Sequence, residues 1–194
     1  MRGARVFGSA WAVMLLASAA HADSKPESKK DRELAAKTPN HAAVLAAGTK
    51  PDPLINLYNE HTHEWLAIDP RQTATPHVLD IFLRDHYTSK STAMEPRLLG
   101  VLVSAAEKFR SPVVDVVSGF RHPKFNLMLR KKGHQVARDS QHTHGNAVDF
   151  FIPGVTTQQL HAWAKSQKLG GVGLYLESGF VHMDTGPIRF WSGD

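Results

Sequence analysis

The sequence SQHTHGNAVD, at residues 140–149, places two histidines, a carboxylate and a glycine directly before an apolar segment at residues 150–152. Imidazole nitrogen and carboxylate oxygen are the usual ligands of hydrolytic zinc, and a catalytic zinc needs only three protein ligands besides water. His142 and Asp149 supply two such ligands. The stretch therefore predicts part of a metal site, whose third ligand lies elsewhere in the chain.

Strand alternation predicts where that third ligand lies. In the run VDFF at residues 148–151, Asp149 points to the face opposite its two apolar neighbours. A carboxylate in so apolar a strand is costly to bury unless a cation pairs with it. The run FVHMD at residues 180–184 has the same parity, so His182 can face Asp149 if the two strands are neighbours.

The predicted zinc site is therefore His142, Asp149 and His182, with an open position for water. Taken singly, the residues have plainer interpretations: His142 can be an ordinary loop residue, and Asp149 can pair with an arginine. Taken together, with Asp184 nearby in the last run, they favour a metal.

Hydrophobic periodicity predicts a single α+β domain with a largely antiparallel sheet flanked by helices. The segment Thr156 to Gln159 has the pattern of a helix capping box. Strands are expected at residues 54–58, 64–68, 113–117, 148–151, 171–175 and 180–184. Helices are expected at residues 76–87, at 95–110, in a segment that ends near 130, and at 157–168.

The first two predicted strands form a hairpin around a polar His-Thr-His turn. His61 and His63 in this turn make a His-x-His pair, which is a minor alternative metal site. Hairpin tips often expose histidine, and no obvious third ligand accompanies the pair. The principal metal prediction therefore stays with His142, Asp149 and His182.

The N-terminal residues predict export. Residues 1–22 have a positive start, an apolar core and the cleavage pattern Ala-His-Ala, which together indicate a secretory signal peptide. Residues 23–50 are expected to be a flexible tether, because the charged first part has few large apolar groups to bury. Residues 51–194 are expected to form the catalytic domain. The predicted location is a bacterial periplasm, without a stable membrane anchor after cleavage.

Composition limits the other possibilities. The chain has no cysteine, which excludes disulfides and thiolate metal sites. The signal peptide carries two of the 23 basic residues and none of the 18 acidic residues, so the net charge falls from +5 to +3 after its removal. The basic residues are scattered rather than gathered on one face, which argues against a nucleic-acid partner. We expect a monomer.

The pattern Ser-x-His-x-x-Gly-x-Ala-x-Asp at residues 140–149 resembles the zinc motif of the D-Ala-D-Ala carboxypeptidase, VanX and hedgehog group of metallopeptidases. Three further blocks match: SGFR at 118–121, GGVGLY at 170–175 and FVHMDTGPIRFW at 180–191. In that combination the chain is similar to the exported YcbK-like, or MepK-type, murein endopeptidases of Gram-negative bacteria. The resemblance covers roughly residues 55–191 and implies a hedgehog/D,D-peptidase-like domain.

The resemblance also implies an activity. It is hydrolysis of murein peptide cross-links by attack of water bound to one zinc ion per chain, with peptidoglycan as the partner. Two alternatives stay open: a D,D-carboxypeptidase, which uses the same metal site, and a non-catalytic, zinc-stabilised module that binds the cell wall.

By the same resemblance, particular residues receive roles. His142, Asp149 and His182 match the zinc ligands, and Arg121 matches an arginine that stabilises the oxyanion of the tetrahedral intermediate. Two carboxylates are candidates for the third catalytic role, proton transfer. Glu177 precedes His182 by five residues, although its neighbour Leu176 departs from the family pattern. Asp184 matches the family and could instead orient a ligand.

Overall fold

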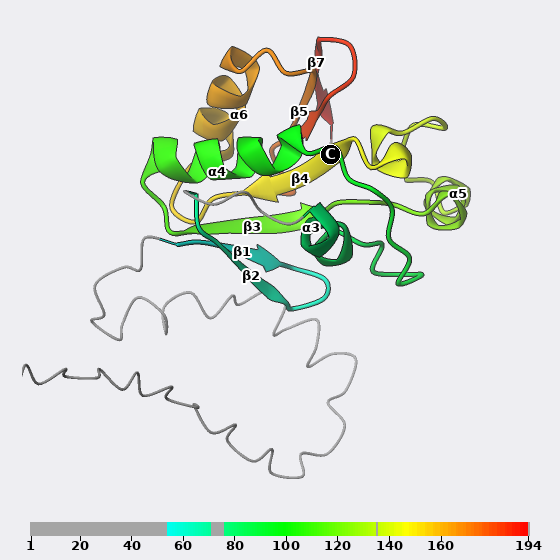
Figure 1. Cartoon of the computed structure of the whole chain (residues 1–194). Coiled ribbons are helices and arrows are strands. Elements are labelled where there is room, and N and C mark those ends of the chain that lie inside the picture. Colours follow the sequence, from blue (N-terminus) through cyan, green and yellow to red (C-terminus); the bar gives the residue numbers. More distant parts are fainter. Residues whose placement is uncertain (1–53, 71–75, 135, 194) are drawn as a thin grey trace, which may run out of the picture. The chain divides into compact units, whose positions relative to one another are not determined.

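The computed structural model describes residues 54–70, 76–134 and 136–193 (Figure 1). The predicted signal peptide and the predicted tether, residues 1–50, lie outside these ranges. Within the described ranges, no helix has both the length and the apolar character needed to cross a membrane.

Seven strands form one sheet in the order β2-β1-β3-β4-β6-β5-β7. Their bounds are Ile55–Asn59 for β1, Trp65–Ile68 for β2, Val113–Ser118 for β3, Ala147–Phe151 for β4, Gly171–Tyr175 for β5, Phe180–Asp184 for β6 and Arg189–Gly193 for β7. The α+β class is confirmed, but the sheet is mixed, because β1 pairs with β3 and β5 pairs with β7 in parallel. In each case the chain first returns along an antiparallel strand. After β1 it returns along β2, and after β5 it returns along β6.

The helices α4 (Arg97–Phe109) and α6 (Thr157–Ser166) lie on one side of the sheet (Figure 1). Alternate strand residues pack beneath them and form the core, including Leu57, Val114, Phe150 and Met183. The residues between these core positions point to the other face. The helices thus leave Asp149 and His182 on the face of the sheet that they do not cover.

Two shorter helices, α3 (Pro76–Phe82) and α5 (Pro123–Lys131), complete the described part together with a single 3-10 turn, η1 (Gln141–His144). The prediction of a helix to residue 87 was wrong, because the Asp85 carboxylate accepts hydrogen bonds from the backbone N–H groups of Thr88 and His122. These bonds hold the following residues in a turn. The capping box at the start of α6 is confirmed, whereas β7 and η1 were not predicted.

Candidate metal centre

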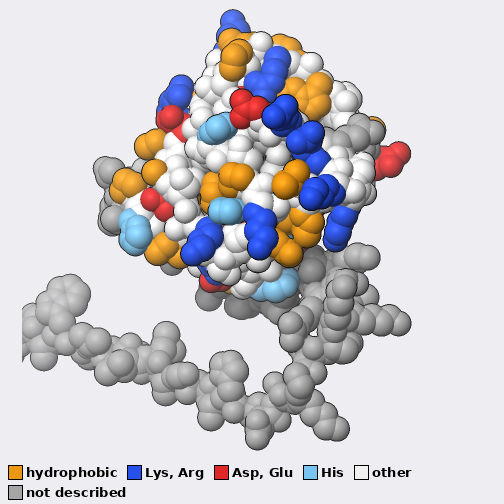
Figure 2. Space-filling model, turned by 90° about the vertical axis from the view of Figure 1, so that its right-hand side faces the viewer, with side chains coloured by type: hydrophobic (Ala, Val, Ile, Leu, Met, Phe, Trp, Pro, Cys, Tyr) orange, Lys and Arg blue, Asp and Glu red, His pale blue; other side chains and the backbone are white. Residues whose placement is uncertain are grey.

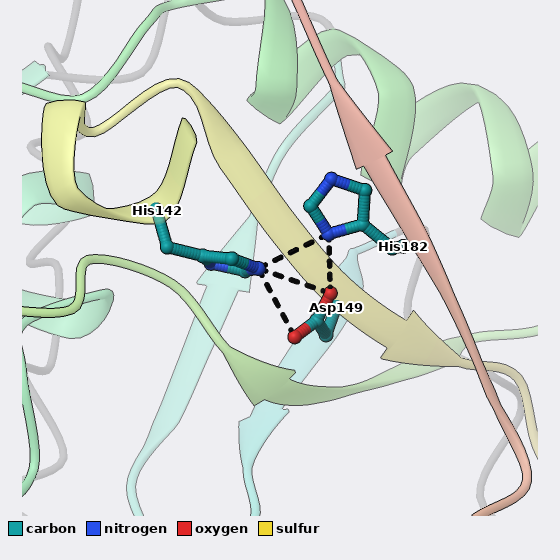
Figure 3. A group of neighbouring side chains, drawn as sticks. All are labelled: His142, Asp149 and His182. Carbon is teal, nitrogen blue, oxygen red and sulfur yellow. Dashed lines mark hydrogen bonds and ion pairs between the residues drawn. The ribbon is translucent and has the colours of Figure 1, made fainter. Parts of the chain in front are cut away.

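The three predicted zinc ligands converge from three different elements (Figure 3). His142 comes from η1, Asp149 from β4 and His182 from β6. One ligand atom from each lies within 4.8 Å of the others, and all three residues are buried, with 3 to 6% of their surface exposed. Among the described residues, this is the one group of three or more metal-type side chains that close together.

Strand register and one glycine produce this convergence. Asp149 and His182 are directly opposed in the antiparallel β4–β6 pair, as the shared parity predicts if the strands are neighbours. His142 reaches them because the chain turns back at Gly145, where φ is +73°. A Cβ atom at this position would lie 2.5 Å from the carbonyl oxygen of Ala93. Glycine is therefore required both by the backbone angle and by the space.

The outer nitrogens of both imidazole rings already have hydrogen-bond acceptors. Nδ1 of His142 lies 2.7 Å from the carbonyl oxygen of Gly119, and Nε2 of His182 lies 3.0 Å from Oδ2 of Asp184. An N–H on each outer nitrogen leaves a lone pair on each inner nitrogen. These inner nitrogens are 3.1 Å apart and lie 3.2 and 2.8 Å from Oδ1 of Asp149.

Lone pairs in that arrangement repel each other unless a cation lies among them. Two neutral imidazoles and one carboxylate are also the donor set that zinc accepts, and the bond from each ring to a backbone carbonyl or carboxylate fixes its orientation. The residues therefore fit a zinc ion, with His142 contributing Nε2 and His182 contributing Nδ1.

Burial and mutual hydrogen bonds shift the pKa values of all three predicted ligands. Burial raises the pKa of Asp149, but the contacts with His142 and His182 outweigh burial and hold it well below its usual range. Burial lowers the pKa of His142. For His182, burial lowers the pKa, but hydrogen bonds to Asp149 and Asp184 outweigh it and raise the value to about 8. The charge of Asp149 can thus be balanced either by a proton on Nδ1 of His182 or by a cation in its place.

Asp184 lies behind the metal-type cluster and is fully buried. Its Oδ1 accepts hydrogen bonds from the backbone N–H groups of Gly171 at 3.0 Å and Gly186 at 2.8 Å. Its Oδ2 lies 3.0 Å from Nε2 of His182 and 2.7 Å from Nη2 of Arg189. Burial raises the pKa of Asp184, but the hydrogen bonds from His182 and the backbone outweigh it and lower the pKa. Both oxygens are thus engaged in holding neighbouring groups.

A cavity of about 310 Å³ opens onto the cluster. Tyr175, Phe180 and Trp191 give it an aromatic wall, and Arg121 also lines it. Nη2 of Arg121 lies 3.8 Å from Oδ2 of Asp149, and the Arg121 backbone N–H donates to the carbonyl oxygen of His142. The predicted oxyanion residue therefore lies beside the predicted ligands. The remaining residues that line the cavity are Val136, Ala137, Asp139, Ser140, Gln141, His142, Asp149, His182 and Arg189.

The structure does not bring every candidate to this cavity. Glu177 lies in the exposed turn between β5 and β6 and is absent from the cavity lining. His144 is exposed and pairs with Asp139, with 2.6 Å between Nε2 and Oδ1. Arg189 was missed as a site residue, although it lies inside the quoted block at residues 180–191. An arginine near an aspartate in sequence gives no sign by itself that the two hold a histidine.

The minor metal alternative at His61 and His63 gains no support from the described residues. Nδ1 of His63 lies 2.7 Å from the hydroxyl oxygen of Tyr58, whereas the His61 ring stacks on His86 with centroids 3.9 Å apart. The two rings thus have different partners. Neither belongs to a group of three metal-type ligands.

Comparison with known proteins adds an independent finding. The family model described as "Peptidoglycan L,D-endopeptidase MepK" matches residues 48–191. The "Probable peptidoglycan L,D-endopeptidase MepK" of Haemophilus influenzae is 32% identical over 161 residues, which cover 80% of this chain and 87% of that protein. The "Peptidoglycan L,D-endopeptidase MepK" of Escherichia coli K12 is 39% identical over 115 residues, covering 58% of this chain and 63%, less than two thirds, of that protein. No solved structure matches the chain.

Proposed function

Because the chain belongs to the peptidoglycan L,D-endopeptidase MepK family, we propose that it hydrolyses peptide cross-links of peptidoglycan with one zinc ion held by His142, Asp149 and His182. The observation that carries this proposal is the convergence of three buried donor atoms within 4.8 Å of one another at a cavity. A non-catalytic wall-binding module would not need Arg121 lining the same cavity.

A zinc ion at this centre would supply a Lewis acid and a bound water with a pKa of about 7. Arg121 is positioned to stabilise the negative charge that develops on the carbonyl oxygen of the scissile peptide. Its side chain is mostly buried and its backbone is tied to η1, so the guanidinium is held in place before the substrate arrives. A fixed cation of this kind stabilises the transition state without reorganising during the reaction.

We assign Asp184 a positioning role. It accepts from Nε2 of His182, and Arg189 and two backbone N–H groups occupy its remaining acceptor positions. A carboxylate engaged in this way orients its histidine and is a poor acceptor for a proton from the substrate side. Glu177 keeps the proton-transfer role only if the exposed turn that carries it moves toward the cavity.

The finer features of the proposal follow from the family. The named activity of the relatives favours an endopeptidase acting on an L,D-linkage over a D,D-carboxypeptidase. Action on peptidoglycan requires a location outside the cytoplasm, and the N-terminal pattern supports export to the periplasm. We further propose a monomer with a hedgehog/D,D-peptidase-like catalytic domain at residues 51–194.

Incubation with peptidoglycan sacculi tests the proposal directly. The protein is incubated with and without a zinc chelator, and the released muropeptides are identified by mass spectrometry. We expect products that disappear with chelator and whose structures identify the cleaved linkage. If no product depends on the metal, the peptidase proposal fails.

A pair of histidine variants tests the ligands. His142→Ala is expected to lose zinc and activity, whereas His144→Ala, at an exposed position in the same turn, should keep both. Unchanged zinc content in His142→Ala, measured by atomic emission, would contradict the ligand assignment.

A further inference from the structure

One segment beside the cavity carries positive charge without any acidic residue. Between Asp115 and Asp139 the chain has six Lys or Arg residues and no Asp or Glu. One of the six is Arg121, which lines the cavity. The other five side chains are exposed, and we call them the α5 face: Lys124, Arg130, Lys131, Lys132 and Arg138. The basic residues, expected to be scattered, are thus concentrated in part in this one segment.

The view onto the side of the molecule that carries α5 shows the same excess of basic over acidic side chains (Figure 2). Lys and Arg side chains outnumber acidic ones over this surface, with hydrophobic side chains between them. Within the described part of the chain, no residue of the α5 face forms an ion pair with a carboxylate. The next acidic residue along the chain, Asp139, is paired with His144.

Helix stabilisation accounts for only some of these charges. Arg130 and Lys131 lie in the last turn of α5, where cations interact favourably with the helix dipole. Lys124 lies in the first turn, where a cation is unfavourable, and Arg138 lies beyond the helix. Three of the five charges thus lie at the C-terminal end of α5, and Lys124 and Arg138 extend the charged region beyond that end.

The α5 face is continuous with the cavity. Asn126 is buried on α5, and its Nδ2 donates to the carbonyl oxygens of Ala137 at 3.0 Å and Arg138 at 3.4 Å. This side chain fastens the segment after α5 against the helix. Because Val136 and Ala137 in the same segment line the cavity, the cationic surface leads directly to the predicted metal centre.

We propose that the α5 face is a docking surface for the free carboxylates of peptidoglycan stem peptides that neighbour the cleaved cross-link. This inference rests on the proposed function for the identity of the substrate. Stem peptides carry several free carboxylates, and a sacculus repeats them over a large area. Exposed cations beside an active site attract and orient such a polyanion, and salt weakens the attraction.

A triple variant tests this surface. Lys124, Lys131 and Lys132 are replaced together by Gln, and the matched control replaces Lys108, Lys165 and Lys168, three exposed lysines outside the α5 face. Both variants change the net charge equally. Binding to sacculi is measured by co-sedimentation with chelator present, so that cleavage does not alter the polymer. We expect the α5-face variant to bind on the order of tenfold more weakly at low salt, and the control to bind like the parent.

Two further measurements identify the ligand. Sacculi whose carboxylates have been amidated should bind the parent as weakly as unmodified sacculi bind the α5-face variant. A soluble cross-linked dimer of two stem peptides should be cleaved by zinc-loaded parent and α5-face variant with kcat/KM values within about twofold. Equal sacculus binding by parent, variant and control, or undiminished parent binding to amidated sacculi, would overturn the inference. Failure of both proteins to cleave the dimer would instead contradict the proposed function, while the binding difference would still decide the docking surface.

Discussion

Arg189 donates a hydrogen bond from Nη2 to Oδ2 of Asp184 at 2.7 Å, and the same oxygen lies 3.0 Å from Nε2 of His182. Three side chains thus form a line from the exposed edge strand β7 to the predicted metal ligand. The Arg189 guanidinium also lies over the Trp191 ring, 5.0 Å from its centroid. An edge-strand residue is therefore coupled to the orientation of a buried imidazole.

Asp184→Asn is expected to weaken zinc binding by about 10- to 100-fold. The amide carries no negative charge, and if its oxygen keeps His182 and Arg189, its NH2 group faces the N–H groups of Gly171 and Gly186. Competition with a chromophoric chelator measures the affinity. Glu177→Gln is the matched control, since Glu177 lies in an exposed turn outside the cavity lining. Equal zinc affinities for the two variants would contradict the positioning role of Asp184.

Arg189→Met is expected to weaken zinc binding on the order of tenfold, less than Asp184→Asn, because Arg189 acts through the carboxylate. Arg189→Lys should recover part of the loss, since an ammonium can still donate to Asp184. The same chelator competition measures both variants. A larger loss in the lysine variant than in the methionine variant would show that Arg189 does not act through its charge and hydrogen bonds.

Arg121→Lys is expected to lower kcat on the order of 100-fold on a cross-linked muropeptide, while zinc content stays unchanged. Lysine keeps the charge but lacks the planar fork that holds the guanidinium beside the reacting carbonyl. Steady-state kinetics separate kcat from KM. An effect confined to KM would indicate that Arg121 binds the substrate without stabilising the transition state.

Gly145→Ala is expected to destabilise the protein by about 3 kcal/mol or more, because the added Cβ meets Ala93 and φ is positive. Gly154→Ala is the control, since Gly154 has a φ of +80° but open space around the added atom. Its expected cost is about 1 kcal/mol from backbone strain alone. Urea unfolding of both variants measures the difference, and equal values would show that the contact with Ala93 relaxes freely.

The two antiparallel hairpins, the core helices and the facing of Asp149 and His182 could be predicted from sequence, because each depends on local periodicity or on parity along one strand. The pairing of β5 with β7 could not, because it depends on where the chain passes after Gly186. The partners of His61 and His63 were equally hidden, since Tyr58 and His86 approach them only in the folded chain. The sequence identified Asp184 as a candidate catalytic residue. Its four partner residues, which only the folded chain brings together, favour orientation of His182 over proton transfer.

His61 predicts a pH dependence of stability. Although the residue is partly exposed, desolvation of its ring, with the nearby His86, His63 and Arg121, lowers the pKa of His61 from 6.5 to about 4. Between these values the unfolded chain binds a proton that the folded chain does not, so stability falls as pH decreases from about 6.5 to 4. His61→Gln should reduce this fall by about 1 kcal/mol, allowing for solvent screening around the exposed ring.

Urea unfolding at pH 6.5 and 4.5, with chelator present, measures the fall for His61→Gln. The exposed His77 on α3 provides the control variant His77→Gln. An identical fall in parent and His61→Gln proteins would show that the ring is freely protonated in the folded state.

The direct opposition of Asp149 and His182 in the β4–β6 pair has a consequence for biogenesis. A slip of one residue between these strands would turn His182 toward the core side and leave the carboxylate without its opposite imidazole. Only correctly registered chains would then acquire the ion at full affinity, and the ion would in turn favour those chains by mass action. Metal uptake would thus serve as a quality check on folding, completed before the molecule can cut the wall.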